Sequence, residues 1–189
     1  KTLGGYDKFY EGDVFYNGIS LKRHYNVLKN IIGYVPQEDI VFENLTLKKM
    51  LYYTAKMKMP DNTSIQEIED RIQEVLRLIE LTEHQNTMIK NLSGGQKKRA
   101  SIAVELLADP GMFFLDEPTS GLDPGTEQKL MRVLNRLSKT QGKTIVMVTH
   151  TTQSLDLCDK IIFMGKKGRL AFMGTPEEAK MFFGTESLI

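Results

Sequence analysis

A strand–helix–strand pattern in the second half of the chain constrains the fold most strongly. The segments GMFFLD (111–116) and KTIVMVTH (143–150) are short apolar runs that each end in a polar residue. The sequence between them, GTEQKLMRVLNRLSKTQG (125–142), has the periodicity of an amphipathic helix and ends in glycine, a common helix stop. Because the two apolar runs do not alternate with polar residues, we expect strands that are buried on both faces. The sequence therefore predicts an α/β fold on a mostly parallel sheet.

Four further segments extend this prediction. Antiparallel hairpins are expected over 11–18 and 160–174, which contain an Asn-Gly and a Lys-Gly turn. The segment NIIGYVPQ (30–37) is expected to be another buried strand that stops at its proline. The segment TPEEAKMFFG (175–184) has the threonine cap, the proline and the two glutamates typical of a helix start.

The middle of the chain, about 45–108, is predicted to be all-helical. The segment 44–60 places its leucines and methionines near one helical face, and 65–81 has one apolar stripe opposite its charges. The length of 189 residues with 41% hydrophobic residues fits one domain. We therefore predict a single domain over 1–189, with the helical subdomain inserted in the α/β core.

Composition narrows the classes of function. The net charge of +1 gives no reason to expect a nucleic-acid partner, and the single cysteine excludes an internal disulfide. No apolar run approaches the roughly 18 residues that span a bilayer, and the first residues lack the apolar region of a signal peptide. A role at a membrane would thus come through a partner or through further chain.

Polar residues follow three of the predicted strands. Gln37, the pair Asp116 and Glu117, and His150 each come directly after an apolar run. Ligands of open α/β sheets bind outside the carboxyl ends of the strands, so we expect these side chains to meet. Adjacent carboxylates at a strand end are how phosphoryl-transfer enzymes hold Mg²⁺ and polarise an attacking water. A solvated strand end, and a structural role for the histidine, are the alternatives.

A glycine pair begins another predicted helix. Ser93, Gly94 and Gly95 precede a helix with small and apolar residues, and a helix N-terminus with glycines lets a phosphate approach the backbone. A plain glycine-rich helix cap is the alternative. The following basic residues, Lys97, Lys98 and Arg99, are predicted to form a solvated helix face rather than a nucleic-acid patch.

In this order along the chain, the segments resemble the nucleotide-binding domain of ATP-binding-cassette (ABC) proteins. LSGGQ (92–96) is similar to the signature of that family, MFFLDE (112–117) to its Walker B strand and SGLD (120–123) to its D-loop. Gln37 takes the place of the Q-loop glutamine and His150 that of the switch histidine. The resemblance covers essentially the whole chain and implies a P-loop NTPase-like fold.

The resemblance also implies a head-to-tail dimer with two ATP molecules at its interface. Asp116 would bind Mg²⁺, and Glu117 would be the general base. Gln37 would reach the metal and the attacking water, and His150 would contact the γ-phosphate. The signature residues Ser93, Gly94, Gly95 and Gln96 would bind the ATP held by the opposite subunit, and Asp123 would couple the two sites.

One family motif is not found in the sequence. The phosphate-binding loop G-x-x-G-x-G-K-[ST] is absent, and Lys1-Thr2 does not fit its end because Gly4-Gly5 follow too soon. The resemblance places this loop upstream of Lys1 and makes the first residues the end of the helix that follows it. This chain alone is therefore expected to bind ATP weakly and to hydrolyse it negligibly.

Within the family, AKMKMP (55–60) and the run 98–124 are most similar to the white/G-type transporters, whose cargo is often lipid-like. Gln96 and Pro124 depart from what that group often carries. A transporter implies a transmembrane permease domain, fused or separate, at the cytoplasmic face of a membrane, docked around 42–52. A non-transport ABC ATPase or a regulatory nucleotide-sensing module is the alternative, although the compact segment 37–92 has no sustained heptads.

Overall fold

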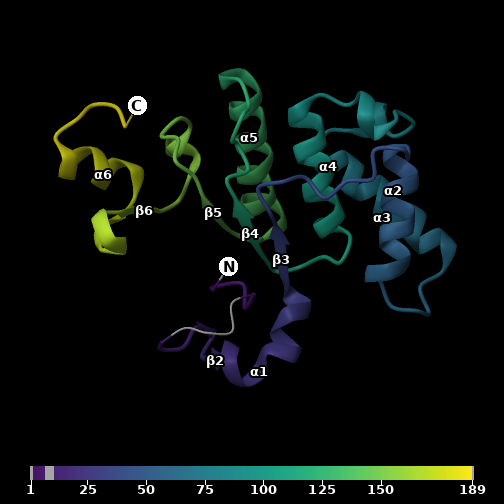
Figure 1. Cartoon of the computed structure of the whole chain (residues 1–189), viewed down its shortest axis with the longest axis horizontal. Helices are drawn as coiled ribbons and strands as arrows, with labels where there is room; N and C mark the ends of the chain where they lie inside the picture. The colour runs from purple at the N-terminus through teal and green to yellow at the C-terminus, as the bar shows by residue number, and fades with distance from the viewer. Residues whose placement is uncertain (1, 7–10, 189) are drawn as a thin grey trace.

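A three-stranded parallel sheet forms the centre of the computed structural model, which describes residues 2–6 and 11–188 (Figure 1). Its strands are β3 (Ile32–Val35), β4 (Met112–Asp116) and β5 (Thr144–Val148), in the order β3-β4-β5. The middle strand β4 lies in register with both neighbours, so that Phe113 faces Gly33 on one side and Ile145 on the other. The predicted α/β fold with a parallel sheet is confirmed.

Helix α5 (Pro124–Gln141) connects β4 to β5 and packs on the sheet. Asp123 caps its start, and Gly142 ends it in the left-handed conformation at φ 62°, as the sequence predicts. Five apolar side chains form its buried stripe, namely Leu130, Met131, Val133, Leu134 and Leu137. This stripe fixes the ends of β4 and β5 relative to each other.

Both predicted hairpins are present. The first joins β1 (Phe15–Tyr16) to β2 (Ile19–Ser20), and the second joins β6 (Ile161–Met164) to β7 (Leu170–Gly174). Their turn residues have positive φ angles, which Asn and Gly adopt most readily. The expected last helix is α6 (Pro176–Phe183), with Thr175 in a capping box.

The helices expected in the middle of the chain are also present. They are α2 (Leu47–Lys58), α3 (Ile65–Leu78) and α4 (Gly94–Leu106), which lie together at one end of the molecule, opposite β6 and α6 (Figure 1). Their buried apolar side chains belong to one cluster that continues under the central sheet. Helix α4 packs against both the other helices of this segment and strand β3, so it joins the helical segment to the sheet. The division of the chain into an α/β core and a helical subdomain stays a prediction.

Two features near the start of the chain differ from the expectation. Helix α1 (Leu21–Leu28) was not predicted, because it is only eight residues long and its apolar spacing at Leu21, Tyr25 and Leu28 is too short to stand out. Residues 2–5 form a turn closed by the Gly5 N–H donating to the Thr2 carbonyl at 3.1 Å. The helix end expected there is thus not seen among residues 2–6; Lys1 and 7–10 lie outside the described residues.

Across residues 2–6 and 11–188, none of the helices has the length and apolar character needed to cross a membrane.

Candidate functional site

Glu117 is the point at which the three strand ends converge. The Gln37 Nε2 atom, after β3, donates a hydrogen bond to Glu117 Oε2 at 3.1 Å. The His150 Nδ1 atom, after β5, lies 3.3 Å from the same oxygen. These residues are far apart in sequence, so the expectation that the polar residues after the strands meet at one sheet edge holds for these three.

The backbone fixes Glu117 in this position. Its N–H donates to the Val148 carbonyl at 2.9 Å, which continues the β4–β5 pairing one residue beyond the strand. Its backbone φ angle is 45°, in the left-handed region that residues other than glycine rarely adopt. Such a conformation costs about 1–3 kcal/mol and persists only where the surroundings hold it, often at functional sites.

Asp116 has a partner that the sequence did not indicate. The Tyr34 hydroxyl donates to Asp116 Oδ2 at 3.1 Å, and the Tyr34 ring packs on the ring of Tyr6 with centroids 4.7 Å apart. The parallel register explains the contact, because Tyr34 on β3 faces Phe114 on β4, two residues before Asp116. A tyrosine within an apolar run gives no signal of this role without the register.

The signature residues Ser93 and Gln96 form a reciprocal capping box at the start of α4. Ser93 Oγ accepts from the Gln96 N–H at 3.3 Å, and Gln96 Oε1 accepts from the Ser93 N–H at 2.8 Å. The Gln96 Nε2 atom also lies 2.9 Å from Nε2 of His84. The structural role of the motif is thus a helix cap, and its phosphate role stays a prediction.

The two signature glycines differ in their surroundings. A Cβ atom at Gly95 would lie 2.1 Å from the Thr126 methyl carbon, which no structure tolerates without a shift. A Cβ at Gly94 would meet its nearest neighbour, a Leu122 methyl, at an ordinary 3.8 Å. The start of α4 therefore packs directly on the start of α5, and this close approach requires glycine at 95 but not at 94.

Asp123 connects the predicted D-loop to that same junction. Its Oδ1 accepts from the backbone N–H groups of Thr126 and Gly125, both at 3.1 Å. A side-chain hydrogen bond with Thr126, followed by the backbone hydrogen bonds from Thr126 and Gly125, lowers the pKa of the exposed Asp123 carboxyl. Its observed role is the cap of α5, and its role in coupling two sites stays a prediction.

The prediction of a solvated basic face on α4 is wrong for two of its three residues. Lys98 and Arg99 are buried, with 4% and 6% of their surface exposed, and Lys97 is partly covered and pairs with Glu43 at 2.9 Å. The Arg99 guanidinium donates to the Ile79 carbonyl at 3.0 Å, and its burial lowers the pKa of Arg99. Helix α4 is packed against α2, α3, α5 and β3, so little of its surface remains for solvent.

The polar residues at the sheet edge fit a magnesium–nucleotide complex. Asp116, Glu117 and Gln37 provide carboxylate and amide oxygens, the ligand type that Mg²⁺ prefers. No group of three or more histidine, cysteine, aspartate or glutamate residues suited to a metal occurs in the described part of the chain. Mg²⁺ in phosphate sites usually has one or two protein carboxylates and takes its other ligands from phosphates and water.

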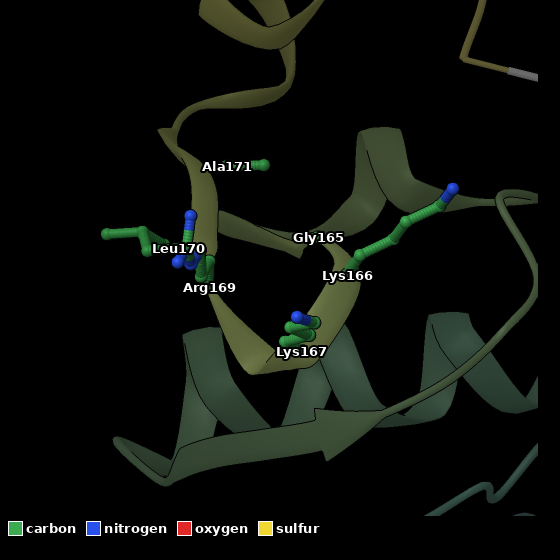
Figure 2. Close-up of a pocket in the computed structure, with 6 residues that line it drawn as sticks. All are labelled: Gly165, Lys166, Lys167, Arg169, Leu170 and Ala171. Atoms are coloured by element: carbon green, nitrogen blue, oxygen red, sulfur yellow. The ribbon is translucent and has the colours of Figure 1, made fainter.

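A hollow of about 410 Å³ lies elsewhere, within the turn between β6 and β7. Figure 2 shows that the side chains of Lys166, Lys167 and Arg169 around it point in different directions. Ligand sites have a few polar groups that converge on one point. This hollow lacks that convergence and is not a candidate site.

The comparisons with known proteins agree with the geometry. The sequence model of the ABC transporter family matches residues 1–120. This chain belongs to the ABC transporter family. The ABC transporter ATP-binding/permease protein Rv1747 of Mycobacterium tuberculosis is 37% identical over 185 residues, which cover 98% of this chain and 21% of that protein. Protein white of Drosophila melanogaster is 39% identical over 159 residues, or 80% of this chain and 23% of that protein.

Solved ABC structures share the fold. The cbiO1 protein of Clostridium perfringens, part of the ABC transporter complex cbiONQ, aligns with a TM-score of 0.85 and 28% identity over 95% of this chain and 72% of that chain. The ATP-binding cassette MJ0796, a dimer in a post-hydrolysis state bound to ADP and Pi, aligns with a TM-score of 0.75 and 30% identity over 91% of this chain and 76% of that one. The resemblance to ABC nucleotide-binding domains is therefore confirmed.

The similarity includes the white-type relatives that the sequence suggested. A further relative, the broad-specificity transporter ABCG2 of Bos taurus, is 36% identical over 92% of this chain and 27% of that protein. This chain thus spans between about a fifth and a quarter of the length of these relatives. A non-transport ABC ATPase is not favoured by these matches.

The close approach of Gly95 to Thr126 allows a direct test of the packing at the signature. Gly95→Ala is expected to destabilise the protein by about 1–3 kcal/mol, the usual cost of overpacking. Gly94→Ala is the matched control and is expected to be neutral or slightly stabilising, because its Cβ has room and alanine favours helix. Urea denaturation of both variants measures the difference, and equal stabilities would contradict the close contact with Thr126.

Proposed function

We propose that the complete protein binds and hydrolyses ATP between two cassettes in a head-to-tail dimer, to drive transport across a membrane. The observation that carries this proposal is the meeting of Gln37 and His150 at one oxygen of Glu117. The similarity to white-type relatives supports a hydrophobic or lipid-like substrate.

The roles proposed for the sheet-edge residues follow from their chemistry. Glu117 is the general base that accepts a proton from the attacking water, and Gln37 orients that water through its amide. His150 contacts the γ-phosphate from the end of β5. Asp116 binds Mg²⁺, with its carboxylate oriented by Tyr34; the ion, when bound, neutralises charge on the phosphates.

The signature is proposed to serve a second nucleotide. Ser93, Gly94, Gly95 and Gln96 at the start of α4 offer a hydroxyl, an amide and helix N–H groups to the γ-phosphate of ATP in the opposite cassette. The close approach of Gly95 to Thr126 supports a role for Asp123 in coupling the two nucleotide sites. Thr126 touches the signature through Gly95 and the D-loop through Asp123, so the two motifs meet at one junction. The dimeric state of the solved relative with ADP and Pi is consistent with this arrangement.

A transmembrane permease domain is proposed to dock on the loop after Gln37, at the cytoplasmic face of the membrane. Ile40 and Phe42 of this loop are exposed, which provides the apolar surface that docking requires. The expected surface over 42–52 is smaller than predicted, because Leu47 and Met50 are buried in the core. The names of relatives such as Rv1747 include a permease, which favours a fused membrane domain.

We also propose that residues 1–189 form a single cassette, with 45–108 as its helical subdomain. A regulatory module without turnover is the second candidate. Glu117 and His150 are both in place at the sheet edge, and this weighs against it.

Calorimetric titration with Mg-ATP tests the proposal and the expected position of the phosphate-binding loop. The two proteins compared are this chain and a form that continues upstream of Lys1, both with Glu117→Gln so that bound ATP is not hydrolysed. Tight binding and ATP-driven dimerisation are expected in the extended form alone. Equally tight binding by both would place the loop's role within this chain, and binding by neither would contradict the proposed function.

A further inference from the structure

We propose that Lys98 is a positioning residue for catalysis, which holds the segment 37–39 so that the Gln37 amide meets Glu117. This inference rests on the proposed function, because it gives a role in ATP hydrolysis to a side chain outside the sheet edge. It concerns how the site is held together rather than which groups react.

The surroundings of Lys98 are unusual for a lysine. Its side chain is buried within the fold, and its Nζ atom donates to the Gln37 carbonyl oxygen at 2.7 Å. The same Nζ atom lies 2.9 Å from Oδ1 of Asp39. Lysine is almost never fully buried unless it is paired, since a buried ammonium loses its hydration. The two contacts therefore hold the backbone carbonyl of Gln37 and the side chain of Asp39, one on each side of residue 38.

The segment that Lys98 holds lies beyond the paired part of β3. Gln37 itself is exposed, and it comes after the last residue of β3, where strand pairing has ended. Its side chain donates to Glu117, while its carbonyl is taken by Lys98. Gln37 thus accepts a hydrogen bond from Lys98 at its backbone carbonyl and donates one from its side-chain amide to Glu117, the proposed general base.

Lys98 also connects this segment to the signature. It belongs to α4, the helix that begins at Gly94 and is capped by Ser93. A chain of direct contacts therefore runs from α4 through Lys98 to Gln37 and on to Glu117. If the signature end of α4 shifts, the position of the Gln37 amide changes with it.

The charge of Lys98 is required for this role, so Lys98→Met is the informative variant. In the extended, ATP-hydrolysing protein it is expected to lower kcat by roughly 10- to 100-fold, because small misplacements of an orienting group have effects of this size. The KM for ATP should change by less than about twofold, since an interaction that acts in the transition state changes kcat and leaves ground-state binding largely intact. Lys97→Met, which removes the adjacent partly covered cation, is the matched control and should leave kcat unchanged.

A double-mutant cycle separates positioning from general destabilisation. If Lys98 acts through the Gln37 amide, then adding Lys98→Met to Gln37→Ala should cause no further loss of kcat. Losses that multiply would overturn the proposal, as would a Lys98→Met protein with normal kcat. Lys98→Arg, which keeps the charge, should recover part of the rate.

A measurement on this chain itself does not depend on hydrolysis. The Val41 N–H donates to the Asp39 carbonyl at 3.1 Å, so its exchange reports on how firmly Asp39 is held. Hydrogen exchange of the Val41 amide is expected to accelerate at least tenfold in Lys98→Met relative to the wild type, with exchange in β4 unchanged. Unchanged exchange at Val41 would overturn the anchoring role. Should Lys98→Met not fold, Asp39→Ala removes one partner of the ammonium and should accelerate exchange at the same amide.

The two proposals fail in different ways. If the wild-type extended protein neither binds nor hydrolyses ATP, the proposed function is wrong, whatever the exchange data show. If it hydrolyses ATP normally and Lys98→Met does so too, the positioning role alone is wrong.

Discussion

Replacement of Glu117 by glutamine is expected to reduce ATP hydrolysis by the extended protein about 10²- to 10⁴-fold, the usual contribution of a general base. Binding of Mg-ATP should persist, because glutamine has the same shape and its oxygen still accepts from the Gln37 amide. Single-turnover release of phosphate measures the first effect, and calorimetric titration with ATP measures the second.

The control for this experiment is Glu177→Gln, a change of the same chemistry at an exposed position in the first turn of α6. It should leave both hydrolysis and binding unchanged. Retention of more than a tenth of the wild-type rate by Glu117→Gln would show that another group takes the proton. The left-handed backbone at Glu117 would then need a purely structural explanation.

The second large effect concerns stability. Phe113→Ala in the central strand is expected to lower the free energy of unfolding by about 3–5 kcal/mol, as for other buried phenylalanines. The Phe113 side chain lies at the centre of the sheet, with 2% of its surface exposed and neighbouring strands on both sides. Urea denaturation measures the loss.

Phe42→Ala provides the matched comparison, because the same side chain is removed where 62% of its surface is exposed. Its free energy of unfolding should stay within about 0.5 kcal/mol of the wild type, as for most surface changes. A small loss for Phe113→Ala, or a large one for Phe42→Ala, would contradict the packing described here. Weaker assembly with the membrane domain in Phe42→Ala would instead support the docking surface.

Much of the fold could be predicted because its signals are local. The apolar runs of β4 and β5, the amphipathic stripe of α5 and the left-handed Gly142 follow from residue types at short spacing. Helix α1 was missed because its apolar spacing extends over only eight residues, too short a window for a helical pattern to stand out. Gln37, Glu117 and His150 were found together because the ends of parallel strands meet at one edge.

The sequence by itself thus determined most of the elements, their order and the polar residues at the strand ends, but not helix α1. Only the tertiary structure decided which of the other polar side chains support them. Tyr34 reaches Asp116 across 82 positions, and Lys98 reaches Gln37 across 61. Local polarity places a lysine at the surface, but whether it is buried depends on the carbonyls and carboxylates that distant segments bring to it. The need for glycine at 95 likewise arises from Thr126, which touches it only when α4 and α5 pack together.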